Sequence, residues 1–184
     1  MIKDGIEYAD DNTESIKTLF KLRIPSLFLG LILGIILSFL TSRFEQVLMK
    51  NIEIAFFIPF VVYVADAVGS QTQGIYSGGL RLGKAKFFKY LLKESALGLV
   101  FGLIFGAIIF SIVALWFSSV ALALTVALSS FFAVATAPII SLFVTEILQL
   151  IRKDPAANSG PITTVIQDTA SILIYGFIAS ALIL

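Results

Sequence analysis

The sequence contains neither cysteine nor histidine, and this absence excludes several kinds of chemistry at once. Without cysteine there is no disulfide and no thiolate nucleophile, and without both residues the usual ligands of zinc are missing. A cation bound by this chain would have to be held by oxygen atoms, which suit hard ions such as Mg²⁺, Mn²⁺ or Ca²⁺. The net charge of +1 gives no reason to expect a nucleic-acid partner.

Charged residues are also scarce, at 14% of the chain, whereas 58% is hydrophobic and the mean hydropathy is +1.00. A chain of this length with such a composition is too apolar for a soluble domain and indicates a membrane protein. We expect an all-α fold with five transmembrane helices, because five stretches approach or exceed the roughly 20 residues that cross a bilayer. These stretches are residues 24–42, 52–76, 95–117, 118–150 and 161–184. Residues 1–23 are interpreted as a short polar tail on the cytoplasmic side rather than a signal peptide.

The basic residues predict the orientation of these helices. Eleven of the 13 Lys and Arg residues lie in the tail, after the second segment or after the fourth, and these regions share one side if all five segments span. The two exceptions are Arg43 and Lys50. The amino terminus is therefore predicted to be cytoplasmic and the carboxyl terminus external, in a multi-pass protein of the cytoplasmic membrane.

Two aspartates lie at positions where a membrane helix should least contain them. Asp66 is in the second segment and Asp168 in the fifth, and an ionisable residue inside the membrane is a functional candidate because it is costly to keep there. At 1.5 Å per residue, Asp66 lies about 18 Å from the external end of its helix and Asp168 about 15 Å from the cytoplasmic end of its own. In a core about 30 Å thick, the two carboxylates fall at similar depth. No Lys or Arg lies near either aspartate in these segments, which favours a shared cation over an internal ion pair.

Each aspartate belongs to a row of polar residues on one face of its helix. The two rows have the same offsets of 0, 4, 7 and 11 residues. They consist of Asp66, Ser70, Gln73 and Ser77 in the second segment and of Thr164, Asp168, Ser171 and Tyr175 in the fifth, with Gln167 beside them. Polar rows are costly in lipid, so we expect them to face the bundle interior or a water-filled path. Hydrogen bonds between helices, with a protonated aspartate, are the structural alternative.

The start of the fifth segment is predicted to be a broken helix. Asp154 precedes Pro155, a favourable helix start, and a second break is expected at Ser159–Gly160–Pro161. A break at membrane depth frees backbone groups to contact an ion or water, which makes Asn158 and Ser159 candidates for the same path. A plain loop at the membrane face is the alternative.

Several other residues near the membrane receive structural interpretations. Gly98, Gly102 and Gly106 recur every four residues, which allows helix backbones to approach closely, either within the chain or at a dimer contact. Within-chain packing is the preferred interpretation. Glu94 and Glu146 lie near the cytoplasmic ends of their helices and are interpreted as acids of the membrane interface.

Two stretches resemble the signature regions of the MgtE family of magnesium transporters and channels. They are FIPFVVYVADAVGSQT, residues 57–72, and DPAANSGPITTVIQD, residues 154–168. The resemblance covers about residues 20–184 and implies an ion-transport domain over residues 24–184, not an enzyme. It also implies a homodimer in the lipid bilayer, with a Mg²⁺ path lined by the second and fifth segments of both subunits, where Asp168 contacts a hydrated ion. The tail is too short for the amino-terminal sensor and CBS domains of longer family members, so none is expected here.

The second segment departs from the family's common GNAGSQ pattern, which has Asn where this chain has Ala67 and Gly where it has Asp66. We therefore expect Asp66 to join Asp168 in the metal site, for Mg²⁺ first and for Mn²⁺ or another divalent ion as substitutes. Alternatively, the two aspartates serve a Na⁺- or H⁺-coupled cation exchanger. A remote alternative is an intramembrane aspartyl protease, although the YD and GxGD patterns of that group are missing. A purely structural subunit would tolerate neutralisation of both acids.

Overall fold

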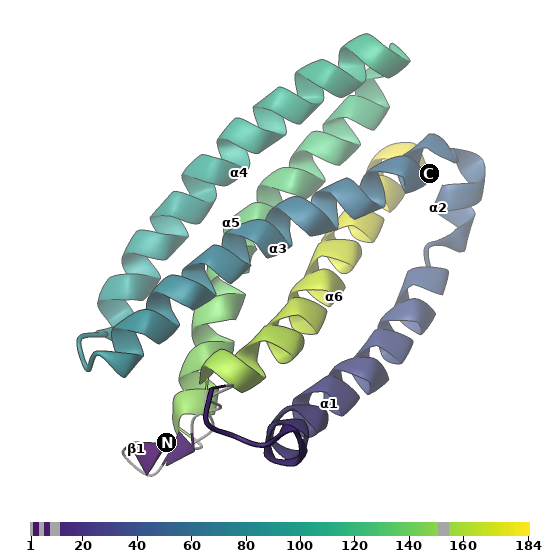
Figure 1. Cartoon of the computed structure of the whole chain (residues 1–184). Helices are drawn as coiled ribbons and strands as arrows, with labels where there is room; N and C mark the ends of the chain where they lie inside the picture. The colour runs from purple at the N-terminus through teal and green to yellow at the C-terminus, as the bar shows by residue number, and fades with distance from the viewer. Residues whose placement is uncertain (1, 4–5, 8–11, 151–154) are drawn as a thin grey trace.

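The computed structural model places long antiparallel helices side by side (Figure 1). It describes residues 2–3, 6–7, 12–150 and 155–184, and for residues 2–3, 6–7 and 155–159 the description covers the backbone alone. The helices are α1 (Ile16–Ser42), α2 (Glu45–Lys50), α3 (Glu53–Arg81), α4 (Phe87–Phe117), α5 (Val120–Leu150) and α6 (Pro155–Ile183). Near the amino terminus, the two-residue strands β1 (Ile2–Lys3) and β2 (Ile6–Glu7) pair antiparallel.

Five of these helices are long and apolar enough to cross a membrane, as the sequence predicts. They are α1, α3, α4, α5 and residues Gly160–Ile183 of α6, and each is at least 24 residues long. Hydrophobicity marks the apolar centre of a helix better than its polar ends, so α1 and α4 begin earlier than predicted, at Ile16 and Phe87. The start of α1 is capped by Ser15, whose side chain accepts a hydrogen bond from the Thr18 N–H at 3.3 Å.

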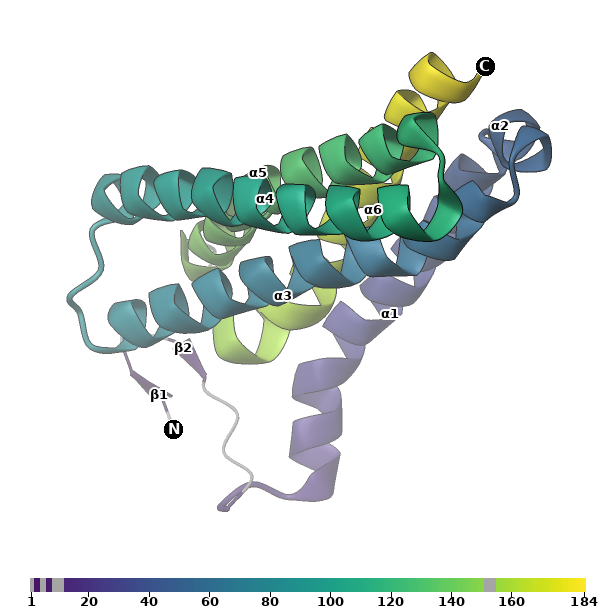
Figure 2. The ribbon, with the colours of Figure 1, turned by 90° about the horizontal axis from the view of Figure 1, so that it is seen from above.

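The most buried of the five spans is α5, which packs against α3, α4 and α6. α3 also packs against α6, so α3, α5 and α6 form a group of three mutually contacting helices. α4 covers α5 on one flank, and α1 packs against α6 at the opposite edge of the bundle (Figures 1 and 2). This arrangement places α3 and α6 next to each other, although more than 70 residues separate them in the sequence.

The glycines of α4 allow its close approach to α5. A Cβ atom at Gly102 would lie 2.7 Å from the Phe131 carbonyl oxygen, and one at Gly106 would lie 3.1 Å from the Ala127 carbonyl oxygen. Gly98 faces α5 in the same way. The predicted close packing within the chain is therefore confirmed for this glycine repeat.

Short turns hold α3, α4 and α5 in their antiparallel order. Gly83 has a φ of 67°, and this left-handed conformation ends α3 with the Lys84 N–H donating to the Gly79 carbonyl oxygen at 3.0 Å. Ser118, after α4, adopts a φ of 52° in a two-residue connection to α5.

The predicted break at Ser159–Gly160–Pro161 is wrong. α6 is one continuous helix from Pro155 to Ile183, with Pro161 inside it. A single proline removes one backbone hydrogen bond and crowds the preceding turn, but it does not end a helix whose other turns are intact and supported by neighbours. Pro161 has such support from α1, since a Cβ atom at Gly30 would lie 3.7 Å from the Pro161 carbonyl oxygen.

Candidate functional site

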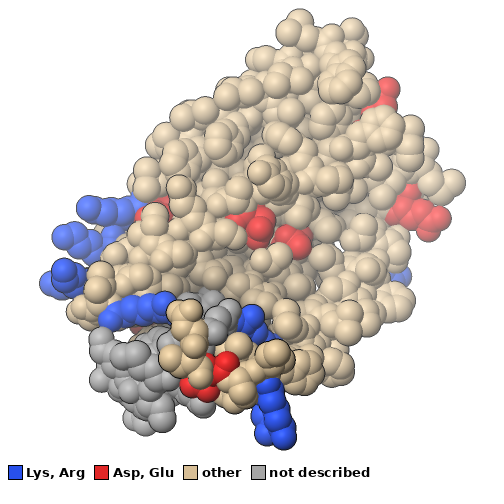
Figure 3. All heavy atoms as spheres, viewed as in Figure 1, with Lys and Arg blue, Asp and Glu red and all other residues tan. Residues whose placement is uncertain are grey.

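Asp66 on α3 and Asp168 on α6 come together across the contact between these two helices. The two carboxyl groups are near enough to interact electrostatically, and both side chains are half-buried. Figure 3 shows acidic atoms side by side in the middle of the face over α3 and α6, whereas Lys and Arg atoms on this face lie toward the ends of the bundle. Asp66 and Asp168, which the helix rise predicts to lie at similar depth, are thus also close to each other in the structure.

One carboxylate oxygen of Asp66 lacks a partner in the described part of the chain. Oδ1 is buried and forms no hydrogen bond. Leaving a buried polar atom unsatisfied costs about 1–3 kcal/mol, and more when the atom belongs to a charged group. A bound cation or the water around it would compensate this oxygen.

The donor set suits a cation that keeps much of its water. Among the described residues no group of three or more acidic side chains could enclose a metal ion. Two carboxylates from one copy of the chain leave most of an octahedral shell open, and Mg²⁺ characteristically retains several waters in such sites. The arrangement therefore fits transient contact with a hydrated ion better than permanent capture of a bare one.

The other residues of the two polar rows separate into an open group and an interior group. Ser70 is exposed, and Gln73 and Thr164 are half-buried. The interior residues are Ser77, Gln167 and Ser171, all buried within the single chain. Each row was predicted to lie on one face, but its offsets span the boundary between the packed side of the helix and its open side. A sequence period alone does not reveal where that boundary falls.

Gln167 occupies the contact between α3 and α6. Its side chain lies against Gly69, where a Cβ atom would fall 2.7 Å from the Gln167 Cδ. From α5, the Ser141 hydroxyl donates a hydrogen bond to the Gln167 Oε1 at 3.3 Å. Within the described residues the Gln167 Nε2 has no partner. The absence of a side chain at Gly69 is thus required because an amide group fills the space.

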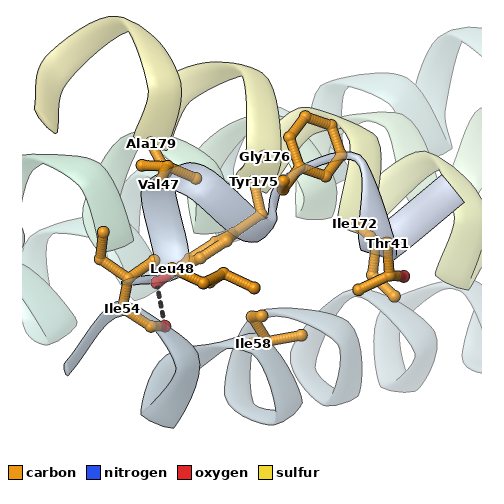
Figure 4. Close-up of a pocket in the computed structure, with 10 residues that line it drawn as sticks. Thr41, Val47, Leu48, Ile54, Ile58, Ile172, Tyr175, Gly176 and Ala179 are labelled. Carbon is orange, nitrogen blue, oxygen red and sulfur yellow. Dashed lines mark hydrogen bonds between the residues drawn. The ribbon is translucent and has the colours of Figure 1, made fainter. Parts of the chain in front are cut away.

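Tyr175, predicted to continue the polar row of Asp168, instead joins helices at the far end of the bundle. Its side chain is buried, and its hydroxyl donates to the Ile54 carbonyl oxygen at 2.7 Å (Figure 4). The pocket beside it, between α1, α2, α3 and α6, has a volume of about 10 Å³ and a largely apolar lining. The Phe44 ring lies in this region against Gly176, so the described residues at this end of the structure form a packing junction.

The interpretation of Glu94 and Glu146 as simple interfacial acids missed their partners on α3. Thr72 donates a hydrogen bond to Glu94 Oε2 at 2.8 Å, and the Tyr76 hydroxyl donates to Glu146 Oε2. Both hydroxyl-bearing residues are 1% exposed. The available signal was the spacing of Thr72 and Tyr76, one helical turn apart beside the GSQ sequence, which predicts a common face.

The predicted candidates at the start of α6 are not tested by this geometry. The side chains of Asn158 and Ser159 lie outside the described residues, as does Asp154 entirely.

Comparison with known proteins identifies the family. A family model named MgtE, described as a divalent cation transporter, matches residues 58–178, which include both Asp66 and Asp168. The chain belongs to the MgtE family. The resemblance carried by the two signature stretches is thereby confirmed.

Two MgtE relatives match nearly the whole chain. The magnesium transporter MgtE of Bacillus subtilis (strain 168) is 29% identical over 164 residues, which cover 88% of this chain and 36% of that protein. The magnesium transporter MgtE of Enterococcus faecalis (strain ATCC 700802 / V583) is 27% identical over 179 residues, covering 96% of this chain and 39% of the relative. The chain therefore spans less than half the length of these relatives.

Membership in the MgtE family identifies the general class of protein. The family consists of transporters rather than enzymes, so the protease interpretation is set aside. Together with the five apolar helices, it makes the chain a multi-pass membrane protein.

Proposed function

We propose that this chain carries Mg²⁺ across the cytoplasmic membrane along a path lined by α3 and α6 of two copies, with the amino terminus on the cytoplasmic side. The observation that carries the proposal is the meeting of Asp66 and Asp168 from two different helices, with one buried Asp66 oxygen left without a partner among the described residues. The names of the two MgtE relatives support Mg²⁺ as the ion.

The chemistry of Mg²⁺ explains why two carboxylates suffice. The ion loses its inner waters reluctantly, so a path that binds it through those waters avoids most of the dehydration cost. The carboxylates would attract the hydrated ion, while the exposed Ser70 and the half-buried Thr164 offer hydrogen bonds to its waters. Binding of this kind is strong enough to admit the ion and weak enough to release it.

A second copy of the chain would solve the problem of exposed charge. Figure 3 shows acidic atoms on a lateral face of the bundle, over α3 and α6, and a charged group that is partly exposed to lipid is costly. Pairing two such faces around a two-fold axis would remove them from lipid and bring four carboxylates to one level. An isologous dimer is the commonest symmetric assembly and needs only this one surface.

Transport measurements on the complete chain in lipid vesicles test the proposal. A Mg²⁺-sensitive dye inside the vesicles would report uptake by the wild type, and Asp168→Ala should reduce the rate by at least about tenfold, because the path loses a charge that attracts the ion. Glu45→Ala is the matched control, since Glu45 is exposed on α2, a helix that carries neither Asp66 nor Asp168, and its loss should leave uptake unchanged. Undiminished uptake by Asp168→Ala would refute the assigned role of this aspartate.

The absence of native cysteine makes the dimer directly testable. Ser70→Cys places a single thiol on the open face next to Asp66. Oxidation in membranes should give a covalent dimer, whereas a thiol at the buried Ser129 of α5 should give none. Cross-linking that is equal at both positions would argue against pairing through the α3 and α6 face.

The unpartnered Asp66 oxygen also supports a second candidate, an exchanger in which Na⁺ or H⁺ movement drives Mg²⁺. Asp66 supplies a carboxylate where the common family pattern has glycine, so this chain has one more anionic group per copy for a second ion. Imposed Na⁺ and pH gradients distinguish the two candidates. Mg²⁺ flux that follows voltage alone supports a passive path, and flux driven by either gradient at zero voltage supports exchange.

A further inference from the structure

Two hydrogen bonds tie α3 to α4 and to α5, on the side away from the predicted external end. Thr72 donates to Glu94 on α4 at 2.8 Å, and Tyr76, one turn later, donates to Glu146 on α5. Thr72 and Tyr76 are buried at 1% exposure, and the two glutamates are half-buried. One helix therefore bonds to two others through the same kind of hydroxyl–carboxyl pair, one turn apart.

The surroundings of Tyr76 fix the direction of its hydroxyl. Its ring packs edge-on against Tyr90, with 5.0 Å between ring centroids, and against Phe87 at 6.3 Å. Two aromatic neighbours restrict rotation of the ring, so the bond to Glu146 is directional and cannot follow a rotation of α3 without being broken.

Helix geometry relates these bonds to the ion site. At about 100° per residue, Thr72 and Tyr76 point between about 80° and 120° away from Asp66 around the axis of α3. Gly69 lies between the two directions and contacts Gln167 of α6. A rotation of α3 that broke the two hydroxyl bonds would therefore also swing Asp66 away from Asp168.

We propose that Glu94 and Glu146 are positioning residues that hold α3 in register with α6 through the hydroxyls of Thr72 and Tyr76, and thereby set the spacing of Asp66 from Asp168. A carboxyl group offers two oxygen atoms that can accept a hydroxyl hydrogen bond, which suits acidic residues for this task. Each glutamate accepts the hydroxyl hydrogen bond through its Oε2 atom. The transport consequence rests on the proposed function, whereas the effect on α3 does not.

Variants that retain or remove the acceptor test the inference. Glu146→Gln and Glu94→Gln each keep an oxygen that accepts the hydroxyl, whereas Glu146→Leu and Glu94→Leu remove it at similar volume. Each Leu variant should raise the KM for Mg²⁺ by about tenfold, because the loss of one such bond lets Asp66 move, and should change the maximal rate per folded molecule much less. Each Gln variant should stay within about twofold of the wild type in both parameters.

A second measurement follows α3 itself and needs no transport. Backbone amide exchange, followed by mass spectrometry, should become faster in the part of α3 after Thr72 in Thr72→Val and Tyr76→Phe. Tyr63→Phe is the matched control on the same helix, because Tyr63 is 72% exposed and, within the described residues, no hydrogen bond ties it to another helix. This control should leave exchange in α3 unchanged.

These measurements distinguish failure of the positioning role from failure of the proposed function. Leu and Gln variants with equal kinetics, or a Leu variant that merely lowers the amount of folded protein at unchanged KM, would overturn the positioning role. Unchanged exchange in both Thr72→Val and Tyr76→Phe would overturn it as well. If the wild type moves no Mg²⁺, the proposed function fails, and faster exchange confined to these two variants would still support the coupling of α3 to α4 and α5.

Discussion

Replacement of Gly69 by alanine tests whether α3 and α6 pack as closely as the structure indicates. The added Cβ would lie 2.7 Å from both Cδ and Nε2 of Gln167, whereas ordinary carbon contacts are about 3.5–4.0 Å. Gln167 has little freedom to withdraw, because it is 1% exposed and its Oε1 is bonded to Ser141. Either the amide must leave its bond or the helices must separate by about 1 Å, and overpacking of this kind typically costs about 1–3 kcal/mol.

Gly74→Ala on the same helix isolates this cost. A Cβ atom at Gly74 meets nothing within 4 Å. Both substitutions gain the same helix propensity, up to about 1 kcal/mol, so the difference between them measures the overlap alone. We expect Gly69→Ala to be less stable than Gly74→Ala by about 1–3 kcal/mol.

The assay is equilibrium unfolding in mixed detergent micelles, followed by circular dichroism. A double-mutant cycle gives the sharper test, because Gln167→Ala removes the group that the new methyl would meet. In that background, Gly69→Ala should cost no more than Gly74→Ala does. Equal stabilities of the two single variants, or an undiminished cost of Gly69→Ala beside Gln167→Ala, would refute the close contact.

Two further predictions concern packing away from the ion site. Gly102→Ala should lower the free energy of unfolding by about 1–3 kcal/mol, because its Cβ would lie 2.7 Å from the Phe131 carbonyl oxygen, which is backbone and cannot rotate aside. Gly34→Ala has open space and should not destabilise; equal effects in chemical denaturation would contradict the α4–α5 contact. Tyr175→Phe should cost about 1 kcal/mol, because the hydrogen bond to the Ile54 carbonyl oxygen is lost, and an unchanged unfolding midpoint would exclude this role.

The polar positions of α6 illustrate how far a sequence pattern reaches. The four-residue spacing of Thr164, Asp168 and their neighbours correctly indicates a helix with polar groups inside an apolar span. It did not separate the half-buried Asp168 from the buried Ser171 and Tyr175, because the packed side of α6 is defined by where α3 and α5 lie. Periodicity gives the angle between two side chains but not the direction of the neighbouring helices.

The α6 proline and the two glutamates show the same limit. Pro161 predicts a break, yet the helix continues because its neighbours support it. Glu94 and Glu146, near basic residues of the predicted cytoplasmic side, suggest interfacial acids, yet each is the acceptor for a hydroxyl more than 20 residues away in the sequence. Local composition predicts local electrostatics, whereas a hydrogen bond between helices depends on the register in which they pack.

The sequence by itself determined that this is a five-helix membrane protein and that any cation must meet oxygen ligands, and it predicts that two aspartates lie at similar depth. These conclusions follow from composition and helix rise, since a segment in lipid must satisfy its own backbone hydrogen bonds, and a long apolar helix does so. Only the tertiary structure decided that Asp66 and Asp168 are neighbours, that Gln167 fills the space above Gly69, and that α3 is tied to α4 and α5. The depth of a residue follows from its own helix alone. Whether two residues are close depends on how their helices are rotated and paired, and the packing between segments that are distant in the sequence decides this.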